Sequence, residues 1–170
     1  FSMLAMCDPN YCFTLYDVGS YGSNNDCGIL AKSSMGEGFE YGEIKLPDPQ
    51  ALPGCSFNPL PFYILGDDIF PLKMWLLKPF GGKDLTEEQQ IYNLRNSRAR
   101  RTIEKAFGIL ATRRKIFSKP IRATVKNTEN YVLASLALHT VFSRIEAAVS
   151  KCFFKKKTRL LFEGGYYLRA

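Results

Sequence analysis

The order of elements along the chain predicts an α/β fold. Three observations support this prediction: an N-terminal pair of segments, one apolar and one rich in aromatic and β-branched residues, a short apolar run at Phe62–Leu65, and two long segments with helical periodicity at 86–114 and 129–150. Strands that alternate with helices are typical of α/β domains. The length of 170 residues fits one domain with a buried core.

The N-terminal segment is expected to form a β-hairpin. Phe1–Cys7 is apolar, Asp8-Pro9-Asn10 is a turn signal, and Tyr11–Val18 is rich in aromatic and β-branched residues. These features are typical of two antiparallel strands.

A loop follows the hairpin, and Asn25 or Asp26 is expected to cap a short helix over Cys27–Met35. Residues 36–61 contain many Gly and Pro residues, which predict an irregular surface segment.

The apolar run at Phe62–Leu65 is typical of a strand that is buried on both faces. Gly66-Asp67-Asp68 ends it, and a short helix is expected over Leu72–Leu77, before Pro79. Functional groups gather at the carboxyl ends of strands in open α/β sheets, which makes Asp67 a candidate site residue.

A helix is expected to begin near Thr86, since Thr86 and Gln89 have the spacing of a capping box, and to continue to about Arg114, with or without a break. Glu104 lies at the edge of an apolar stripe in this helix. The stripe consists of Ala99, Ile103, Ala106 and Leu110.

The last predicted helix is expected to direct four apolar side chains inward: Leu133, Leu136, Val141 and Ile145. His139 is interpreted as a packed core histidine. Residues 1–150 are therefore expected to form the domain, and residues 151–170 a basic tail. Lys155–Lys157 in this tail would extend a basic surface or act as a nuclear import signal.

The charge of the chain points to an acidic partner. The net charge is +7, and ten Lys or Arg residues but one acid, Glu104, lie between Arg95 and Arg122. A solvated helix face is the usual meaning of such a run. The alternative is contact with DNA phosphates, for which the candidates are Arg95, Arg98, Arg100, Arg101, Arg113, Arg114 and Lys115.

Cysteine spacing and hydropathy disfavour other classes of protein. The five cysteines include no CxxC pair, which argues against a zinc site or a disulfide framework and favours a reducing compartment. No run of 18 apolar residues is present, so we expect no membrane span, and the chain has no basic amphipathic helix suited to a membrane surface.

Asp67 and Glu104 are the candidate metal ligands. Two carboxylates that approach each other in a fold repel unless a positive group lies between them, and divalent cations prefer oxygen ligands. A simpler interpretation is also open for each: Asp67 as a turn residue, and Glu104 as an ion-pair partner of Arg100 or Arg101.

Three blocks of sequence carry a family resemblance. They are Tyr16–Leu30, Ile64–Leu72 and Leu85–Leu110. In order and spacing these blocks resemble the C-terminal part of the Harbinger-type transposase-derived nucleases, the DDE superfamily endonuclease domain. The resemblance covers roughly residues 1–140.

The resemblance implies an RNase H-like fold and three carboxylates that bind Mg²⁺ or Mn²⁺ for DNA cleavage. Asp67 would be the second carboxylate and Glu104 the third. Asp26 matches a further acidic position, where it would support the metal or cap the helix. The resemblance also implies nuclear localisation, DNA as substrate, and a separate Myb-like DNA-binding protein as partner.

The sequence also departs from the family pattern. The strand that carries the first catalytic Asp would lie before Phe1, and Thr140 follows His139 where the family usually has Asn. We therefore expect an N-terminally incomplete domain with little or no nuclease activity by itself. The alternative is a non-catalytic remnant of a domesticated transposase that binds DNA or protein.

Overall fold

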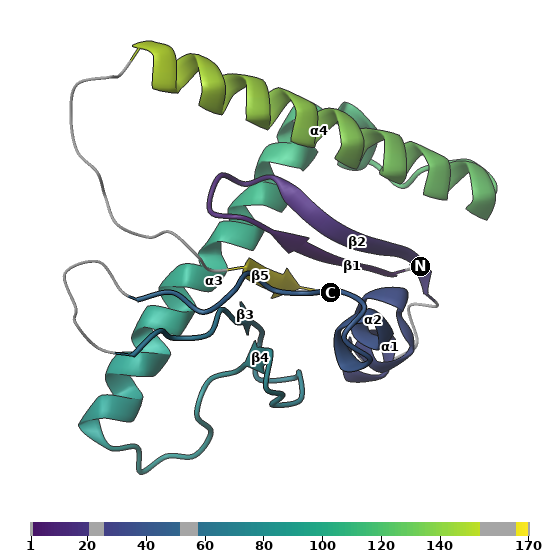
Figure 1. Cartoon of the computed structure of the whole chain (residues 1–170). Coiled ribbons are helices and arrows are strands. Elements are labelled where there is room, and N and C mark those ends of the chain that lie inside the picture. Colours follow the sequence, from purple (N-terminus) through teal and green to yellow (C-terminus); the bar gives the residue numbers. More distant parts are fainter. Residues whose placement is uncertain (1, 21–25, 52–57, 154–165, 170) are drawn as a thin grey trace.

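The computed structural model describes residues 2–20, 26–51, 58–153 and 166–169, which form a five-stranded sheet with helices on both faces (Figure 1). The order of the strands across the sheet is β2-β1-β5-β3-β4. They are β1 (Ser2–Cys7), β2 (Phe13–Ser20), β3 (Ile64–Leu65), β4 (Leu76–Leu77) and β5 (Tyr166–Arg169). This mixture of strands and helices agrees with the predicted α/β class.

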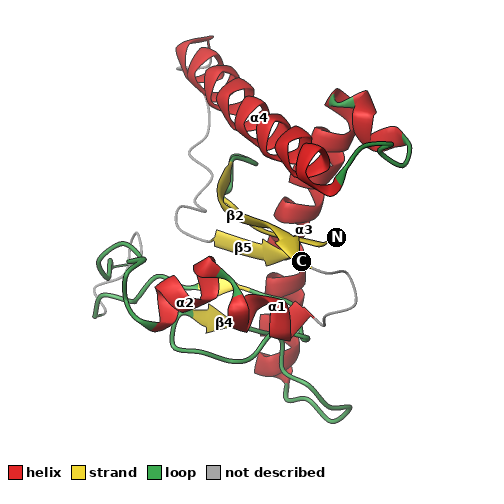
Figure 2. Cartoon of the chain, turned by 90° about the vertical axis from the view of Figure 1, so that its right-hand side faces the viewer, coloured by secondary structure: helices red, strands yellow, loops and turns green. Residues whose placement is uncertain are grey.

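Alternating side chains of the central strands divide the core into two layers. The helices are α1 (Asp26–Lys32), α2 (Ser34–Glu40), α3 (Glu87–Arg113) and α4 (Val125–Phe153), with a short 3₁₀ helix at Lys115–Ser118. The layer beside α1 and α2 consists of Leu4, Met6, Ile29, Leu30, Met35, Phe39, Ile64, Phe70 and Leu76. The layer beside α3 and α4 consists of Ala5, Cys7, Phe13, Leu65, Ile103, Ala106, Leu110, Val132 and Leu136. Figure 2 shows α4 and the α1–α2 pair on opposite sides of the strands.

The predicted β-hairpin is confirmed. β1 and β2 pair antiparallel, with Ala5 opposite Tyr16. The Oδ1 atom of Asp8 accepts hydrogen bonds from the N–H groups of Asn10 at 2.8 Å and Cys12 at 3.0 Å. The turn is therefore stabilised by the aspartate that the sequence pattern identifies.

β5 lies between β1 and β3. It runs antiparallel to β1 and parallel to β3, with Leu65 opposite Tyr167. The expected tail from residue 151 onward thus contributes a strand to the sheet, and the expected boundary at residue 150 falls within α4. Lys155–Lys157 lie outside the described residues.

The prediction of one short helix over Cys27–Met35 is wrong in its extent. Two helices form here, because the Ser33 hydroxyl donates to the carbonyl of Leu30 at 2.8 Å and accepts from the N–H of Gly36 at 2.9 Å. A Cβ atom on Gly36 would lie 1.9 Å from the Leu30 carbonyl oxygen, so this close approach requires glycine. α2 buries Phe39, and the start of the expected surface segment belongs to the core.

The predicted helix over Leu72–Leu77 is also wrong, because this segment ends in strand β4. The N–H of Ile64 donates to the carbonyl of Trp75, and the N–H of Gly66 donates to that of Leu77, both at 2.8 Å. Leu76 is completely buried between these bonds. Parallel pairing with β3 therefore overrides the local helical pattern.

α3 confirms the helix predicted from Thr86 onward, and it continues without a break. The capping box is present, with the Thr86 side chain accepting from the N–H of Gln89 and the Gln89 side chain accepting from the N–H of Thr86. Ile103, Ala106 and Leu110 are buried against the sheet as predicted. This packing fixes the rotation of the helix and the direction of Glu104.

α4 forms, but its inward face is not the predicted one. Of the four predicted residues, Leu136 is buried, whereas Leu133, Val141 and Ile145 are exposed. The buried positions are Thr128, Val132, Ser135, Leu136, His139 and Ser143. Within the described part of the chain, no helix has the length and apolar character needed to cross a membrane.

Candidate functional site

The candidate site begins where β3 ends. Gly66 is buried against Phe70 and Leu76, and the carbonyl of Asp67 accepts the N–H of Phe70 at 3.2 Å in the turn that follows. These contacts hold the backbone of Asp67 at the carboxyl end of β3, with its side chain half-buried. Its Oδ1 atom accepts the N–H of Asp68 at 2.8 Å, while the Asp68 side chain is exposed.

Arg100 of α3 binds the second oxygen of Asp67. Its Nη2 atom lies 2.6 Å from Oδ2 of Asp67, and the two side chains are 18% and 35% exposed. Partial burial shields this ion pair from solvent, and a charge-assisted hydrogen bond of this length is a strong one. The positive group that lies at the Asp67 carboxylate is thus a guanidinium group.

Glu104 follows Arg100 by one helical turn. Residues four apart on a helix lie on the same side, so the Arg100–Asp67 contact brings Asp67 to the part of α3 that carries Glu104. Glu104 is exposed, and it interacts within the chain. Asp67 thus contacts α3 at Arg100, one helical turn before Glu104.

Asp26, the third predicted metal ligand, is the first residue of α1, and its side chain lies outside the described part. Among the described residues, no group of three or more His, Cys, Asp or Glu side chains is placed to share a metal ion. Asp67 and Glu104 still offer the carboxylate oxygens that Mg²⁺ prefers. Because this ion commonly takes one or two carboxylates and completes its shell with water and phosphate, the donor chemistry fits.

The predicted DNA-binding residues divide into two groups. Arg95, Arg98, Arg101 and Lys115 are exposed, and none forms an ion pair within the described residues. The others have partners: Arg100 binds Asp67, Arg113 donates to both carboxylate oxygens of Glu146 at 2.8 Å, and Arg114 lies 5.5 Å from the centre of the Phe142 ring. Exposed cations are thus available mainly in the middle of α3.

The Arg100–Asp67 pair is the feature that sequence reasoning missed. The sequence pattern predicts Glu104 or DNA as the partner of Arg100, because residues four apart on a helix suggest a local pair. No sequence signal linked it to Asp67, since their proximity depends on the packing of α3 against the sheet.

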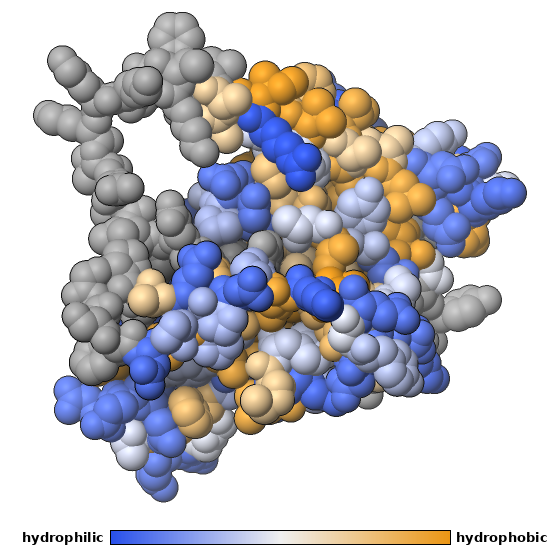
Figure 3. Space-filling model, viewed as in Figure 1, coloured by the Kyte–Doolittle hydropathy of each residue, from blue (hydrophilic) through white to orange (hydrophobic). Residues whose placement is uncertain are grey.

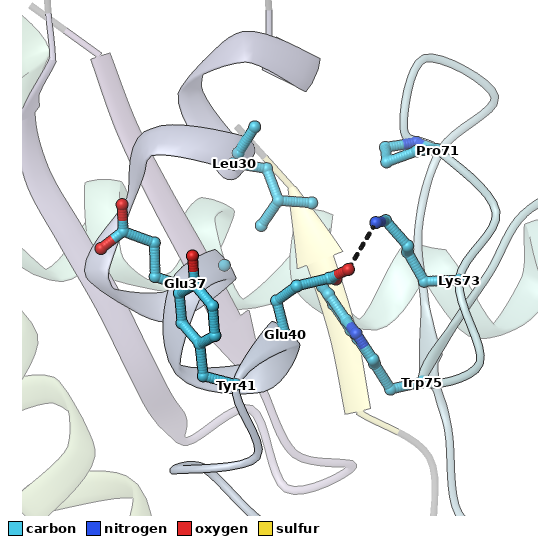
Figure 4. Close-up of a pocket in the computed structure, with 9 residues that line it drawn as sticks. Leu30, Glu37, Glu40, Tyr41, Pro71, Lys73 and Trp75 are labelled. Atoms are coloured by element: carbon cyan, nitrogen blue, oxygen red, sulfur yellow. Dashed lines mark hydrogen bonds and ion pairs between the residues drawn. The ribbon is translucent and has the colours of Figure 1, made fainter.

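A separate pocket of about 230 Å³ lies between α2 and the segment before β4. Figure 4 shows Lys73 pointing across it toward Glu40, with the Nζ and Oε1 atoms 3.0 Å apart. Trp75 forms part of the lining and stacks on Phe39, with 4.8 Å between the ring centres. Neither Asp67 nor Glu104 lines this pocket. The facing charges of Lys73 and Glu40 neutralise each other within it.

Comparisons with known proteins agree with the resemblance. Residues 1–140 match a family model described as "DDE superfamily endonuclease". "Protein ALP1-like" of Arabidopsis thaliana is 35% identical over 117 residues, which cover 69% of this chain and 28% of that protein. "Putative nuclease HARBI1" of Homo sapiens is 26% identical over 141 residues, which cover 81% of this chain and 36% of that protein.

The chain thus spans about a third of the length of these curated relatives, 28% of one and 36% of the other. No solved structure matches it.

Proposed function

We propose that this chain, which belongs to the DDE superfamily endonuclease family, forms part of a DNA nuclease domain. In this domain Asp67 and Glu104 would hold Mg²⁺ or Mn²⁺. The observation that carries this proposal is the contact of Asp67 with Arg100, one helical turn before Glu104. Packing of α3 on the sheet puts the strand-end acid Asp67 in contact with Arg100, and Glu104 follows Arg100 by one helical turn. Such a pair of acids, beside exposed cations, suits a site for a metal ion and a phosphodiester.

The chain's own residues would divide the work between the metal and the DNA backbone. A bound divalent cation would supply a water of lowered pKa and stabilise the leaving oxygen. Asp67 and Glu104 would orient that cation, while Arg95, Arg98, Arg101 and Lys115 would bind phosphates and position the duplex without reading its sequence.

Target choice would come from elsewhere. Contacts to phosphates carry no sequence information, so we propose that a separate Myb-like protein selects the DNA site, as the resemblance implies. The resemblance also implies nuclear localisation, and we propose that location for the activity.

A non-catalytic role in DNA binding is the second candidate. Both oxygens of Asp67 already accept hydrogen bonds from the protein, and the described residues include no three-ligand metal group. In this candidate the chain would keep the basic surface of α3 and would not hydrolyse DNA, and the bonds already accepted by Asp67 support it.

Binding of Mn²⁺ to the chain separates the two candidates. We expect Asp67→Asn and Glu104→Gln each to raise the Mn²⁺ Kd by about tenfold or more, because each removes an anionic oxygen ligand. Asp68→Asn is the matched control, and we expect it to change the Kd by less than about twofold, since its exposed side chain lacks the contact with α3. Electron paramagnetic resonance of free Mn²⁺ measures all three.

If Asp67→Asn and Asp68→Asn bind Mn²⁺ equally well, the metal site at Asp67 is wrong. The salt dependence of duplex DNA binding then tests the remnant. We expect replacement of Arg98 and Arg101 by Gln to reduce the slope of log K against log salt by roughly one for each residue. A slope that does not change would exclude α3 as the DNA-binding surface.

A further inference from the structure

Arg100 occupies the place where the proposed cation would bind. Its guanidinium group lies 2.6 Å from Oδ2 of Asp67, in a partly buried ion pair. A divalent cation on the same carboxylate oxygen would repel the guanidinium group at short range. The two positive groups are therefore competitors for Asp67.

The surroundings of Arg100 indicate that Asp67 does not satisfy the whole guanidinium group. The Nε atom of Arg100 is buried and has no hydrogen-bond partner within the described residues. A guanidinium group carries five N–H donors in a planar fork that matches phosphate as well as carboxylate. Arg100 thus retains donors suited to a second acceptor.

A phosphate of bound DNA is the acceptor that the chemistry of the guanidinium group favours. A divalent cation held by Asp67 would also attract phosphate oxygens, because such ions take carboxylate and phosphate oxygens as ligands. Arg101, the next residue, is exposed and adds positive potential on a neighbouring face of α3. A displaced Arg100 therefore has an anion within reach.

We propose that Arg100 is an exchangeable counter-ion that couples metal binding to DNA binding. Without the cation it neutralises Asp67, and with the cation it binds a DNA phosphate. This inference rests on the proposed function, because it requires Asp67 to be a metal ligand. It adds a regulatory consequence: the metal and the DNA backbone strengthen each other's binding through one side chain.

Titration of the 170-residue chain with Mn²⁺ alone tests the competition. We expect Arg100→Gln to lower the Mn²⁺ Kd by about tenfold, because it removes the charge-assisted bond that the cation must displace. Arg101→Gln is the matched control, since it removes the same charge from the same helix, and we expect a change of less than about threefold. Arg100→Lys keeps a cation near Asp67 and should stay within about threefold of the parent chain.

Binding of a short DNA duplex, measured by fluorescence anisotropy with and without Mn²⁺, tests the coupling. For each chain, the ratio of the DNA Kd without Mn²⁺ to the DNA Kd with Mn²⁺ gives the gain. We expect this gain to be about fivefold or more larger in the parent chain than in Arg100→Gln. Arg101→Gln should weaken binding in both conditions and leave the gain unchanged. Thermal melts without metal establish that each variant is folded.

Equal Mn²⁺ Kd values for Arg100→Gln and Arg101→Gln would overturn the counter-ion role. If Asp67→Asn still weakens Mn²⁺ binding in that case, the proposed function stands without it. If Asp67→Asn has no effect on Mn²⁺ binding, both the proposed metal site and this inference are wrong.

Discussion

The two long helices on one face of the sheet differ in what they expose to solvent. The exposed side of α3 carries Arg95, Arg98, Arg101 and Lys105, whereas that of α4 carries Tyr131, Leu138, Val141, Phe142 and Ile145. Figure 3 shows hydrophobic residues gathered along the upper edge of the molecule, where α4 lies in Figure 1. One helix thus presents cations and the other an apolar surface.

The two helices also differ in where their polar contacts lie. On α3, Ile103, Ala106 and Leu110 pack on the sheet, and the polar side chain of Asn96 is buried as well. α4 adds His139, whose Nε2–H donates to the carbonyl of Tyr11 at 2.8 Å, and Thr140, whose hydroxyl donates to that of Phe13 at 3.3 Å. α4 is therefore hydrogen-bonded to the hairpin, whereas α3 is held by apolar contacts with the sheet and by bonds of Asn93 to Phe80 and of Arg100 to Asp67.

The inner and outer sides of α4 should differ most in their effect on stability. We expect Leu136→Ala to lower the free energy of unfolding by about 3 kcal/mol, because Leu136 is completely buried and its truncation leaves a cavity. Leu138→Ala should cost less than about 1 kcal/mol, since that side chain is 47% exposed. Urea denaturation of both variants measures the difference.

Similar losses in the two variants would contradict this orientation of α4. A large loss for Leu138→Ala that depends on protein concentration would instead show that the outer side is covered by another chain in solution.

Acidification should destabilise the docking of α4 through His139. Burial lowers the pKa of His139 below its usual 6.5, an effect that Arg113 and Arg114 reinforce and that the bond to Tyr11 and the charge of Glu146 oppose. The unfolded chain therefore binds a proton more readily than the native chain, and stability is lost as pH falls below about 6.5. Urea denaturation between pH 7.5 and 5.5 should show a smaller loss in His139→Gln than in the parent chain.

An equal pH dependence in both chains would mean that other groups cause it. The apolar stripe of α3 contains no titratable side chain, so replacements within it should not alter the pH dependence.

The different accuracy of the helix predictions follows from the same contrast. In α3, charged residues flank the apolar stripe formed by Ile103, Ala106 and Leu110. Helical periodicity therefore identifies the buried side correctly. In α4 the more apolar side, with Leu133, Val141 and Ile145, is exposed. Periodicity selects that side, whereas small and hydrogen-bonding side chains let the other side approach the hairpin.

The candidate site shows a similar limit. Asp67 was predicted from its place at a strand end, and the fold does bring it to α3. The partner at its Oδ2 atom is Arg100, because contacts between distant segments follow from packing angles that local patterns do not encode. The strand β5 was missed for the same reason, since its pairing with β1 and β3 is entirely non-local.

The N-terminal caps of the two helices offer the smallest test of their difference. α3 has a reciprocal capping box at Thr86, whereas at the start of α4 the Thr124 hydroxyl accepts the N–H of Asn127 at 3.4 Å. We expect Thr86→Ala to lower the free energy of unfolding by about 1 kcal/mol, because it removes the hydroxyl that accepts the N–H of Gln89 in the capping box. Thr124→Ala should cost about half as much, since the cap bonds are equally long but only Thr86 has the reciprocal bond from its N–H to the Gln89 side chain among the described residues. Chemical denaturation measures both losses. A larger loss for Thr124→Ala would contradict this ranking and would show that the cap stabilises the start of α4 more than the cap of α3 stabilises its own start.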